Sequence, residues 1–223
     1  MRQHDVDAVI FDMDGVLVDT EPLYFQVEQQ SFRHFGIKMD EAEHHGYVGV
    51  TLESMWSQIR VKHGLEVPVQ ELLAYHKSNV LQFISAYPDL QPMPHVEAWI
   101  QWLKKQNIPI IVASSSPLPL IELILQKAGL APYFPIKVSG ESMAKGKPEP
   151  DIFLHAASVL GTAPAGCLVI EDSTNGVKAA KAAGMLCVGL KNPNSGNQDV
   201  SQADFKVSGF KELFQLPEVH LQR

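Results

Sequence analysis

The sequence predicts an α/β fold: a doubly wound, Rossmann-like parallel sheet with an inserted α-helical cap. Short apolar runs rich in β-forming residues recur along the chain, as in the buried strands of a parallel sheet. Helical patterns separate most of these runs, which is typical of an open sheet with helices on both faces. The first two runs are an exception, because residues 12–108 lie between them, whereas a simple crossover needs only about 12 residues. We therefore expect a core formed by residues 1–16 and 89–223, and a helical cap formed by residues 17–88.

Six apolar runs are the predicted strands of the core. The first is Ala8 to Phe11, which Gly15 follows closely. Runs of this kind are typical of strands that are buried on both faces of a parallel sheet. The runs at 136–138 and 205–207 are weaker candidates, and the remaining strands are predicted at 109–113, 168–170 and 186–190.

Helices are predicted between the strands and throughout the cap. Apolar stripes at helical spacing mark one core helix around 96–103 and another that ends before Gly129. Two further core helices, 150–160 and 175–183, also end before a glycine. In the cap, where we find no convincing strand, helices are predicted over 22–35, over 51–63 with Thr51 as N-cap, and from Pro68 to about 86. The polar loop 192–201 is expected to be mobile.

Composition and charge exclude several classes of protein. The formal net charge is -7, from 18 basic and 25 acidic residues. An acidic chain without a run of Lys or Arg lacks the features of a nucleic-acid binder or of a protein held on anionic membranes. No apolar stretch approaches the ~20 residues needed to span a bilayer, and no signal peptide begins the chain. We therefore expect a cytoplasmic protein, with Cys167 and Cys187 as small core residues.

Polar side chains follow the predicted strands at the points where they end. Asp12 and Asp14 follow the first strand, and Ser114, Ser115 and Ser116 follow the second. The pair Glu171 and Asp172 follows a later strand, and Lys147 lies in a loop before a helix. Ligands of doubly wound sheets bind at the carboxyl ends of the strands, so we expect these side chains to meet at one edge.

Such a set suits phosphoryl transfer. Crowded carboxylates repel one another and need a cation, and Mg²⁺ prefers one or two carboxylates together with waters and phosphate oxygens. Lys147 would supply a compensating charge, and Ser114 a hydrogen bond to phosphate. One carboxylate can act as nucleophile, forming an aspartyl phosphate, and a second can protonate the leaving group and later activate water. The predicted cofactor is Mg²⁺ and the predicted partner a small phosphorylated metabolite.

Four segments resemble the signature motifs of the haloacid dehalogenase superfamily. They are Asp12-Met13-Asp14-Gly15-Val16-Leu17, Ser114 after an apolar strand, Lys147-Pro148, and Glu171-Asp172-Ser173-Thr174-Asn175-Gly176-Val177. The resemblance covers almost the whole chain. It is closest to the branch with an α-helical cap that contains β-phosphoglucomutase and small sugar-phosphate phosphatases.

The resemblance implies a role for each motif residue. Asp12 would be the nucleophile and a metal ligand, and Asp14 the acid/base that also offers its backbone carbonyl to the metal. Ser114 and Lys147 would hold the transferring phosphoryl group, and Ser115 and Glu21 would contact the substrate. Asp172 would ligate the metal, with Glu171 beside it as a ligand or as its neighbour. The dehalogenase members lack an acid at the position of Asp14, so its presence favours a phosphate ester.

Differences in the cap favour a phosphatase over a mutase. The mutases of this branch carry a histidine where this chain has Leu23 and Tyr24, and an arginine where it has Leu52. We expect hydrolysis of phosphate monoesters, sugar phosphates in particular, by a monomer. The alternatives are a sugar phosphomutase and a non-catalytic phosphosugar-binding protein on the same fold, although the latter would be expected to lose residues such as Asp12 or Lys147.

Other interpretations of single motifs are weaker. A calcium loop would need an oxygen side chain and a glycine where Val16 and Leu17 stand. The metal-binding pair of a nucleotide-sugar transferase would leave Lys147 and Asp172 unexplained. The two adjacent histidines at positions 44 and 45 are expected to lie in a solvated turn rather than in a zinc site. We have no functional interpretation for His95, which stands where the family usually has glycine. Trp99 is predicted to lie in the core, and Tyr24, Trp56 and Lys77 are each expected to be core or surface residues, although they could face a substrate.

Overall fold

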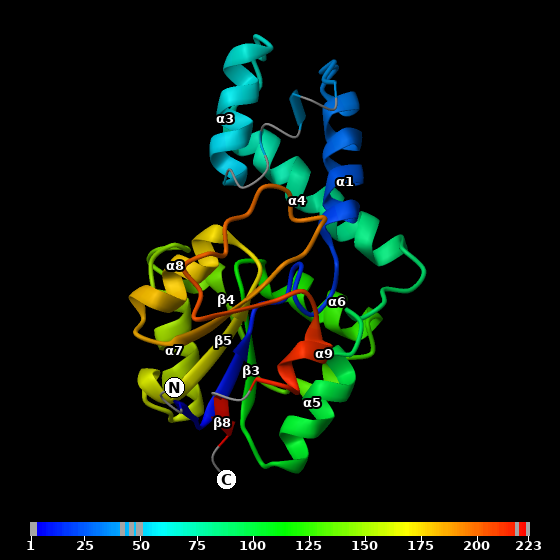
Figure 1. Cartoon of the computed structure of the whole chain (residues 1–223). Coiled ribbons are helices and arrows are strands. Elements are labelled where there is room, and N and C mark those ends of the chain that lie inside the picture. Colours follow the sequence, from blue (N-terminus) through cyan, green and yellow to red (C-terminus); the bar gives the residue numbers. More distant parts are fainter. Residues whose placement is uncertain (1–3, 41–42, 45–46, 48–50, 217–218, 222–223) are drawn as a thin grey trace.

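The computed structural model describes residues 4–40, 43–44, 47, 51–216 and 219–221. It consists of a parallel sheet with helices on both faces and a helical cap above one end of the sheet (Figure 1). The six predicted strands are confirmed and form the main sheet in the order β4-β3-β2-β5-β6-β7. Their bounds are β2 Ala8–Phe11, β3 Ile110–Ser114, β4 Lys137–Ser139, β5 Cys167–Glu171, β6 Leu186–Leu190 and β7 Phe205–Val207.

The core helices flank this sheet. They are α5 Val96–Lys105, α6 Leu118–Lys127, α7 Asp151–Leu160, α8 Thr174–Ala182 and the short α9 Phe210–Leu213. Three single-turn 3-10 helices connect them with the strands, namely η1 Ala131–Tyr133, η2 Gly140–Ser142 and η3 Pro164–Gly166. The four longer helices lie where the sequence predicts them, whereas the one-turn helix α9 was not predicted.

The central strand β2 is buried on both sides, as its apolar run predicts. Val9 and Phe11 point to the face covered by α5, α6 and α9, while Ala8 and Ile10 point to the face covered by α7 and α8. Trp99 of α5 is buried as predicted, and its ring meets that of Phe11 edge to face with centroids 5.5 Å apart. Both cysteines are free and buried, which confirms that they are core residues.

Two short strands were not predicted. β1, His4–Val6, pairs in parallel with β8, Val219–Leu221, at the end of the core remote from the cap (Figure 1). Each has three residues, and the two are distant in sequence, so they become neighbours only once the sheet has formed.

The described part of the cap includes three long helices, which confirms the predicted helical insert. They are α1 Glu21–His34, α3 Leu52–Lys62 and α4 Val69–Ala86. Thr51 caps α3 as expected, since its side chain accepts a hydrogen bond from the amide of Ser54. The outer parts of these helices share their own apolar cluster, Phe32, Ile37, Met55, Trp56, Ile59 and Leu72. Trp56 therefore belongs to the core of the cap.

The two chain segments that join cap and core lie side by side. Val18 forms a bridge with Pro92, and the amide of Met93 donates to the carbonyl of Leu17 over 2.8 Å. Leu23 and Val27 of α1, with Ile84 of α4, extend the main core cluster into the base of the cap. The cap is thus packed onto the core at its base and has a separate apolar cluster further out.

Two histidines differ from what the sequence suggested. The expected solvated turn at 44–45 is wrong for His44, which is 2% exposed and stacks on Phe25 with ring centroids 4.1 Å apart, while the second histidine lies outside the described residues. His95 adopts φ 67° at the N-cap of α5, a left-handed conformation that favours glycine, which accounts for the family's glycine there.

None of the helices that the structure describes is long and apolar enough to cross a membrane.

Candidate active site

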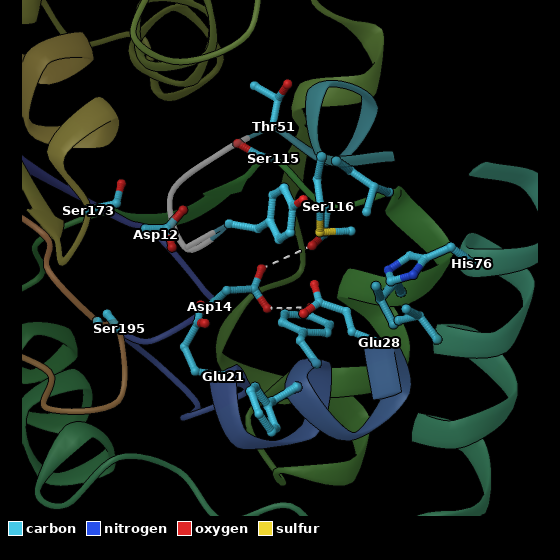
Figure 2. Close-up of a pocket in the computed structure, with 18 of the residues that line it drawn as sticks. Asp12, Asp14, Glu21, Glu28, Thr51, His76, Ser115, Ser116, Ser173 and Ser195 are labelled. Carbon is cyan, nitrogen blue, oxygen red and sulfur yellow. Dashed lines mark hydrogen bonds between the residues drawn. The ribbon is translucent and has the colours of Figure 1, made fainter. Parts of the chain in front are cut away.

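The carboxyl ends of β2, β3 and β5 meet beneath the cap, where a cavity of about 1500 Å³ opens. Its lining comes from the loops after these strands, from cap helices α1 and α4, and from the loop that follows β6. Figure 2 shows Asp12, Asp14, Glu21 and Glu28 around this cavity, together with several serines. The sequence-predicted residues Asp12, Asp14, Glu21, Ser115, Lys147, Glu171 and Asp172 all line it.

Lys147 and two carboxylates form a buried charge cluster. The Nζ atom of Lys147 lies 2.5 Å from Oδ1 of Asp12 and 2.6 Å from Oε1 of Glu171. The side chain of Lys147 is 8% exposed, and those of Asp12 and Glu171 are 9% and 1% exposed. The second oxygen of Asp12 is not bonded to Lys147, so it is the oxygen of this cluster that is available to react.

The carboxylates at this site are crowded. Burial raises the pKa of Asp12 to about 8, with further increases from Glu171 and Asp14, even though Lys147 opposes the shift. Burial likewise raises the pKa of Asp172 well above its ordinary value, helped by the negative charges of Glu171 and Asp12. One ammonium group does not compensate these charges, so the site favours an additional cation.

Asp12 and Asp172 fit a magnesium ion. Mg²⁺ usually takes one or two carboxylates and fills its other positions with waters and phosphate oxygens. A group of three or more His, Cys, Asp or Glu side chains arranged to hold a metal is not found among the described residues. Asp12 and Asp172, which both line the cavity, are therefore the pair of carboxylates that would hold such an ion.

Gly15 allows Asp172 to approach the loop after β2. It has φ +75°, and a Cβ atom there would lie 2.1 Å from Oδ2 of Asp172. Ser195, from the loop after β6, donates a short hydrogen bond to the same oxygen of Asp172. This hydroxyl holds the carboxylate in position, and sequence analysis did not identify it.

The carboxylate of Glu171 is hydrogen-bonded within the protein. One of its oxygens accepts from Lys147, while the other accepts from the amide and the hydroxyl of Ser173, over 2.8 and 3.0 Å. Both oxygens are thus engaged by the protein, and the side chain is fully buried. Whether Glu171 ligates the metal or only lies beside Asp172 stays a prediction, and in this structure its carboxylate bonds to Lys147 and Ser173.

Four hydroxyl groups bind the carboxylate of Asp14. Thr20 and Tyr24 donate to Oδ1 over 2.8 and 2.7 Å, and Ser114 and Ser116 donate to Oδ2 over 3.0 Å each. Figure 2 shows Ser116 beside Asp14. Tyr24 comes from the cap, and the serines come from the core. Asp14 therefore lies at the junction of the two parts of the chain.

The two serines expected to contact substrate lie differently. Ser114 was predicted to hold a phosphoryl group. In the structure it is fully buried, and its hydroxyl donates to Asp14 instead. Ser115 is exposed and lines the cavity. Of the two, only Ser115 presents its side chain to the cavity in this arrangement.

The loop after β6 is anchored to the site rather than detached from it. The Nδ2 atom of Asn192 donates to the carbonyl of Gly15 and to Oδ1 of Asp19, over 3.3 and 3.2 Å. Nδ2 of Asn194 donates to the other oxygen of Asp19 over 2.6 Å. These asparagines were missed because the loop looked merely polar, although its position after a strand of the sheet could have identified it.

Glu21 stands at the start of α1, on the cap side of the cavity. Burial raises its pKa to about 7, and the negative charges of Asp14, Glu28 and Asp19 add to the shift. The cavity is therefore strongly acidic on the side of the cap as well as on the side of the sheet.

Comparisons with known proteins agree with this geometry. A family model described as haloacid dehalogenase-like hydrolase matches residues 6–184. The chain is 33% identical to a phosphorylated carbohydrates phosphatase of Thermotoga maritima, over 81% of this chain and 82% of that protein. It is 34% identical to a beta-phosphoglucomutase of Bacillus subtilis, over 82% of each chain. The crystal structure of CbbY from Rhodobacter sphaeroides in complex with phosphate shares the fold, with a TM-score of 0.81, 24% identity, and coverage of 93% of this chain and 96% of that one.

Proposed function

The chain belongs to the haloacid dehalogenase-like hydrolases, and from this premise we propose that it is a Mg²⁺-dependent phosphatase. Its substrates would be phosphate monoesters of small metabolites, sugar phosphates in particular. One observation carries the proposal: Asp12, paired with Lys147, faces the same cavity as a second carboxylate, Asp14. Hydrolysis through an aspartyl phosphate requires a nucleophile and an acid/base that face one substrate cavity.

In the first step, the free oxygen of Asp12 attacks phosphorus while the bond to the leaving oxygen breaks. Asp14 gives that oxygen a proton, so that a neutral alcohol departs. In the second step, Asp14 takes a proton from water, whose oxygen attacks the phosphorus of the aspartyl phosphate. Inorganic phosphate leaves and the carboxylate of Asp12 is restored.

Lys147 and the exposed Ser115 would hold the transferring phosphoryl group, the former by charge and the latter by a hydrogen bond. Ser114 would act through Asp14, to which it donates in this structure. Mg²⁺ held by Asp12, Asp172 and the Asp14 carbonyl would offset the charge on the phosphoryl oxygens.

A sugar phosphomutase is the second candidate, because a beta-phosphoglucomutase is among the similar proteins. The cap weakens this candidate. Where the mutases have a histidine, Leu23 is buried and Tyr24 is engaged with Asp14. Leu52, rather than arginine, lines the cavity. We therefore favour water over a second sugar hydroxyl as the acceptor of the phosphoryl group.

Phosphate release from a panel of phosphorylated metabolites, with and without Mg²⁺, tests the proposal. We expect Mg²⁺-dependent release concentrated on a few sugar phosphates. With β-glucose 1-phosphate, release of inorganic phosphate without glucose 6-phosphate would support a phosphatase, whereas formation of glucose 6-phosphate would identify a mutase. Binding of these compounds without any turnover would indicate a non-catalytic protein. We also propose that the protein is a cytoplasmic monomer. Size-exclusion chromatography with light scattering tests its oligomeric state.

A further inference from the structure

The cap side of the cavity is lined by a face of α1 and a face of α4. Glu21, Phe25 and Glu28 follow one another at intervals of four and three residues along α1, so they lie on the same face of that helix. His76 lines the cavity from α4. Figure 2 shows Glu28 between Asp14 and His76 in the close-up of the cavity. The part of a substrate that lies beyond its phosphate would meet these side chains.

Glu28 is held in place by the core of the cap. His44 donates a short hydrogen bond to its Oε2 atom, and His44 itself is 2% exposed and stacked on Phe25. Gln29 contacts the other ring nitrogen of His44 over 3.0 Å. The Glu28 side chain is nevertheless 22% exposed, and it lines the cavity. This carboxylate is therefore a fixed hydrogen-bond acceptor at the cap end.

His76 is a buried polar group that lacks a partner. The residue is 5% exposed, and its Nδ1 atom is buried without a hydrogen bond. Burial lowers the pKa of His76, although Glu28 opposes the shift, so its ring is neutral at pH 7 and offers one donor and one acceptor. Buried polar atoms in proteins nearly always have a partner, and a ligand hydroxyl can supply one here.

Among the described residues, the lysines that line the cavity are already paired with carboxylates. Lys77 is bonded to Glu141 over 2.8 Å, and Lys147 is bonded to two carboxylates. No arginine is among the described residues that line the cavity, and the sequence from 41 to 50 contains neither lysine nor arginine. A second phosphate group would therefore lie near the carboxylates of Glu21 and Glu28 without an unpaired lysine or arginine beside it. The resulting loss of binding free energy would set specificity.

We propose that Glu28 and His76 determine specificity by binding the hydroxyl groups of a monophosphate whose remaining part is uncharged and polyhydroxylated, and that the cap rejects bisphosphates. The inference rests on the proposed phosphatase activity and narrows it to one class of substrate. Glu28 would accept hydrogen bonds from hydroxyls, and His76 would exchange a donor and an acceptor with them. Phe25 and Leu52 would contact the carbon atoms between these groups.

Two matched substrates test the charge rule in the wild-type enzyme. Fructose 6-phosphate and fructose 1,6-bisphosphate differ only in the second phosphate. We expect kcat/KM to be at least about tenfold higher for the monophosphate. Glu28→Gln, which removes the charge but keeps an acceptor, should reduce this preference severalfold. Glu53→Gln, at an exposed position on α3 that is not among the lining residues, should leave it unchanged. Equal rates for both substrates, or a preference that Glu28→Gln does not alter, would overturn the proposal.

The role of His76 is tested with a substrate that has no hydroxyls. His76→Phe should raise KM for fructose 6-phosphate about tenfold, while KM for p-nitrophenyl phosphate stays the same. An equal rise for both would mean that His76 only supports the cap. A preference for glucosamine 6-phosphate over glucose 6-phosphate would assign the acidic lining to a cationic substrate instead and would also overturn the proposal.

Binding to Asp12→Asn separates this inference from the proposed function. Calorimetric titration of that variant with the two fructose phosphates measures recognition without hydrolysis. Tighter binding of the monophosphate by Asp12→Asn, together with no phosphate release by the wild-type protein, would support the cap assignment and reject the phosphatase. Phosphate release from both compounds with equal affinity would support the phosphatase and reject the cap assignment. Thermal unfolding shows whether each variant is folded.

Discussion

The ammonium group of Lys147 lies 2.5 Å from Oδ1 of Asp12, and both side chains are more than nine-tenths buried. Removing one partner of a buried pair leaves an uncompensated charge, which typically costs about 3–5 kcal/mol. We expect Lys147→Met to lower kcat by about 10²–10³-fold and to destabilise the protein at pH 8. Lys145→Met, at an exposed position two residues earlier, is the matched control. Unfolding in urea and phosphate release measure the two effects, and a fully active Lys147→Met would exclude this role.

The nucleophile is tested by Asp12→Asn. An amide cannot form the aspartyl phosphate, so we expect kcat to fall by at least about 10³-fold while the fold is retained. Burial penalises the ionised form of Asp12, as its pKa of about 8 indicates, so the variant should unfold at the same or a higher temperature. Circular dichroism and a stopped assay suffice. Equal turnover in wild type and variant would remove Asp12 from the mechanism.

The metal shell is tested by Asp172→Ala and Ser195→Ala. Asp172→Ala removes a proposed ligand and should weaken magnesium dependence and activity together. Ser195→Ala removes only the hydroxyl that positions this carboxylate, and loss of such a partner typically weakens metal binding by about 10–100-fold. Calorimetric titration with Mg²⁺ measures both directly, and Ser208→Ala, at an exposed position, serves as control. An unchanged Mg²⁺ titration in Asp172→Ala would exclude that residue as a ligand.

Glu21 should make stability depend on pH. Its pKa is raised from 4.5 to about 7 in the folded protein, so the folded state binds this proton more tightly than the unfolded state. The corresponding stability is present below pH 4.5 and is lost as the pH rises to 7. Allowing for its partial exposure, Glu21→Gln should be about 2 kcal/mol more stable than wild type at pH 8 and equally stable at pH 4.

Urea unfolding of wild type and Glu21→Gln across this range, without Mg²⁺, measures the difference between them. Glu53→Gln controls for the loss of a surface charge. If the two stability curves run parallel, the protonation of Glu21 does not contribute.

His95 should be replaceable by glycine with a gain in stability. The left-handed conformation at φ 67° costs a non-glycine residue about 1–2 kcal/mol, part of which is offset by the greater freedom of glycine in the unfolded chain. We expect His95→Gly to stabilise the protein by about 0.5–1 kcal/mol without changing kcat. Gly161→Ala is the inverse control, since Gly161 has φ +68° with nothing within 4 Å of an added Cβ, and it should destabilise by about 1 kcal/mol.

The layout of the sheet was predictable because local patterns encode it. A buried parallel strand is a continuous apolar run, as at Ala8–Phe11. Helices that end before a glycine are also predictable, because the glycine marks their end in the local sequence. The pairing of His4–Val6 with Val219–Leu221 could not be predicted from the sequence. Each partner is too short to show a pattern, and its neighbour is fixed only by the finished fold.

The site was predictable to the extent that strand ends position it. This rule finds Asp12, Asp14, Lys147 and Asp172, which the structure brings to one cavity. It does not find which hydrogen bond each side chain makes. Glu171 can bond to Lys147 and Ser173 because Gly176 leaves room for its carboxylate, from which a Cβ at that position would lie only 1.7 Å. Tertiary contacts of this kind, like the burial of His44 against Phe25, are decided between elements distant in sequence.

The pairing of Val18 with Pro92 has a consequence for how such an enzyme can diversify. The first and last residues of the cap segment lie next to each other. Another segment whose ends are equally close could therefore replace it at little cost in chain-closure entropy. Recombination at these two points would leave the strand that carries Asp12 untouched while replacing Glu28 and His76 together. One hydrolytic apparatus can therefore be retargeted to new metabolites in a single genetic event.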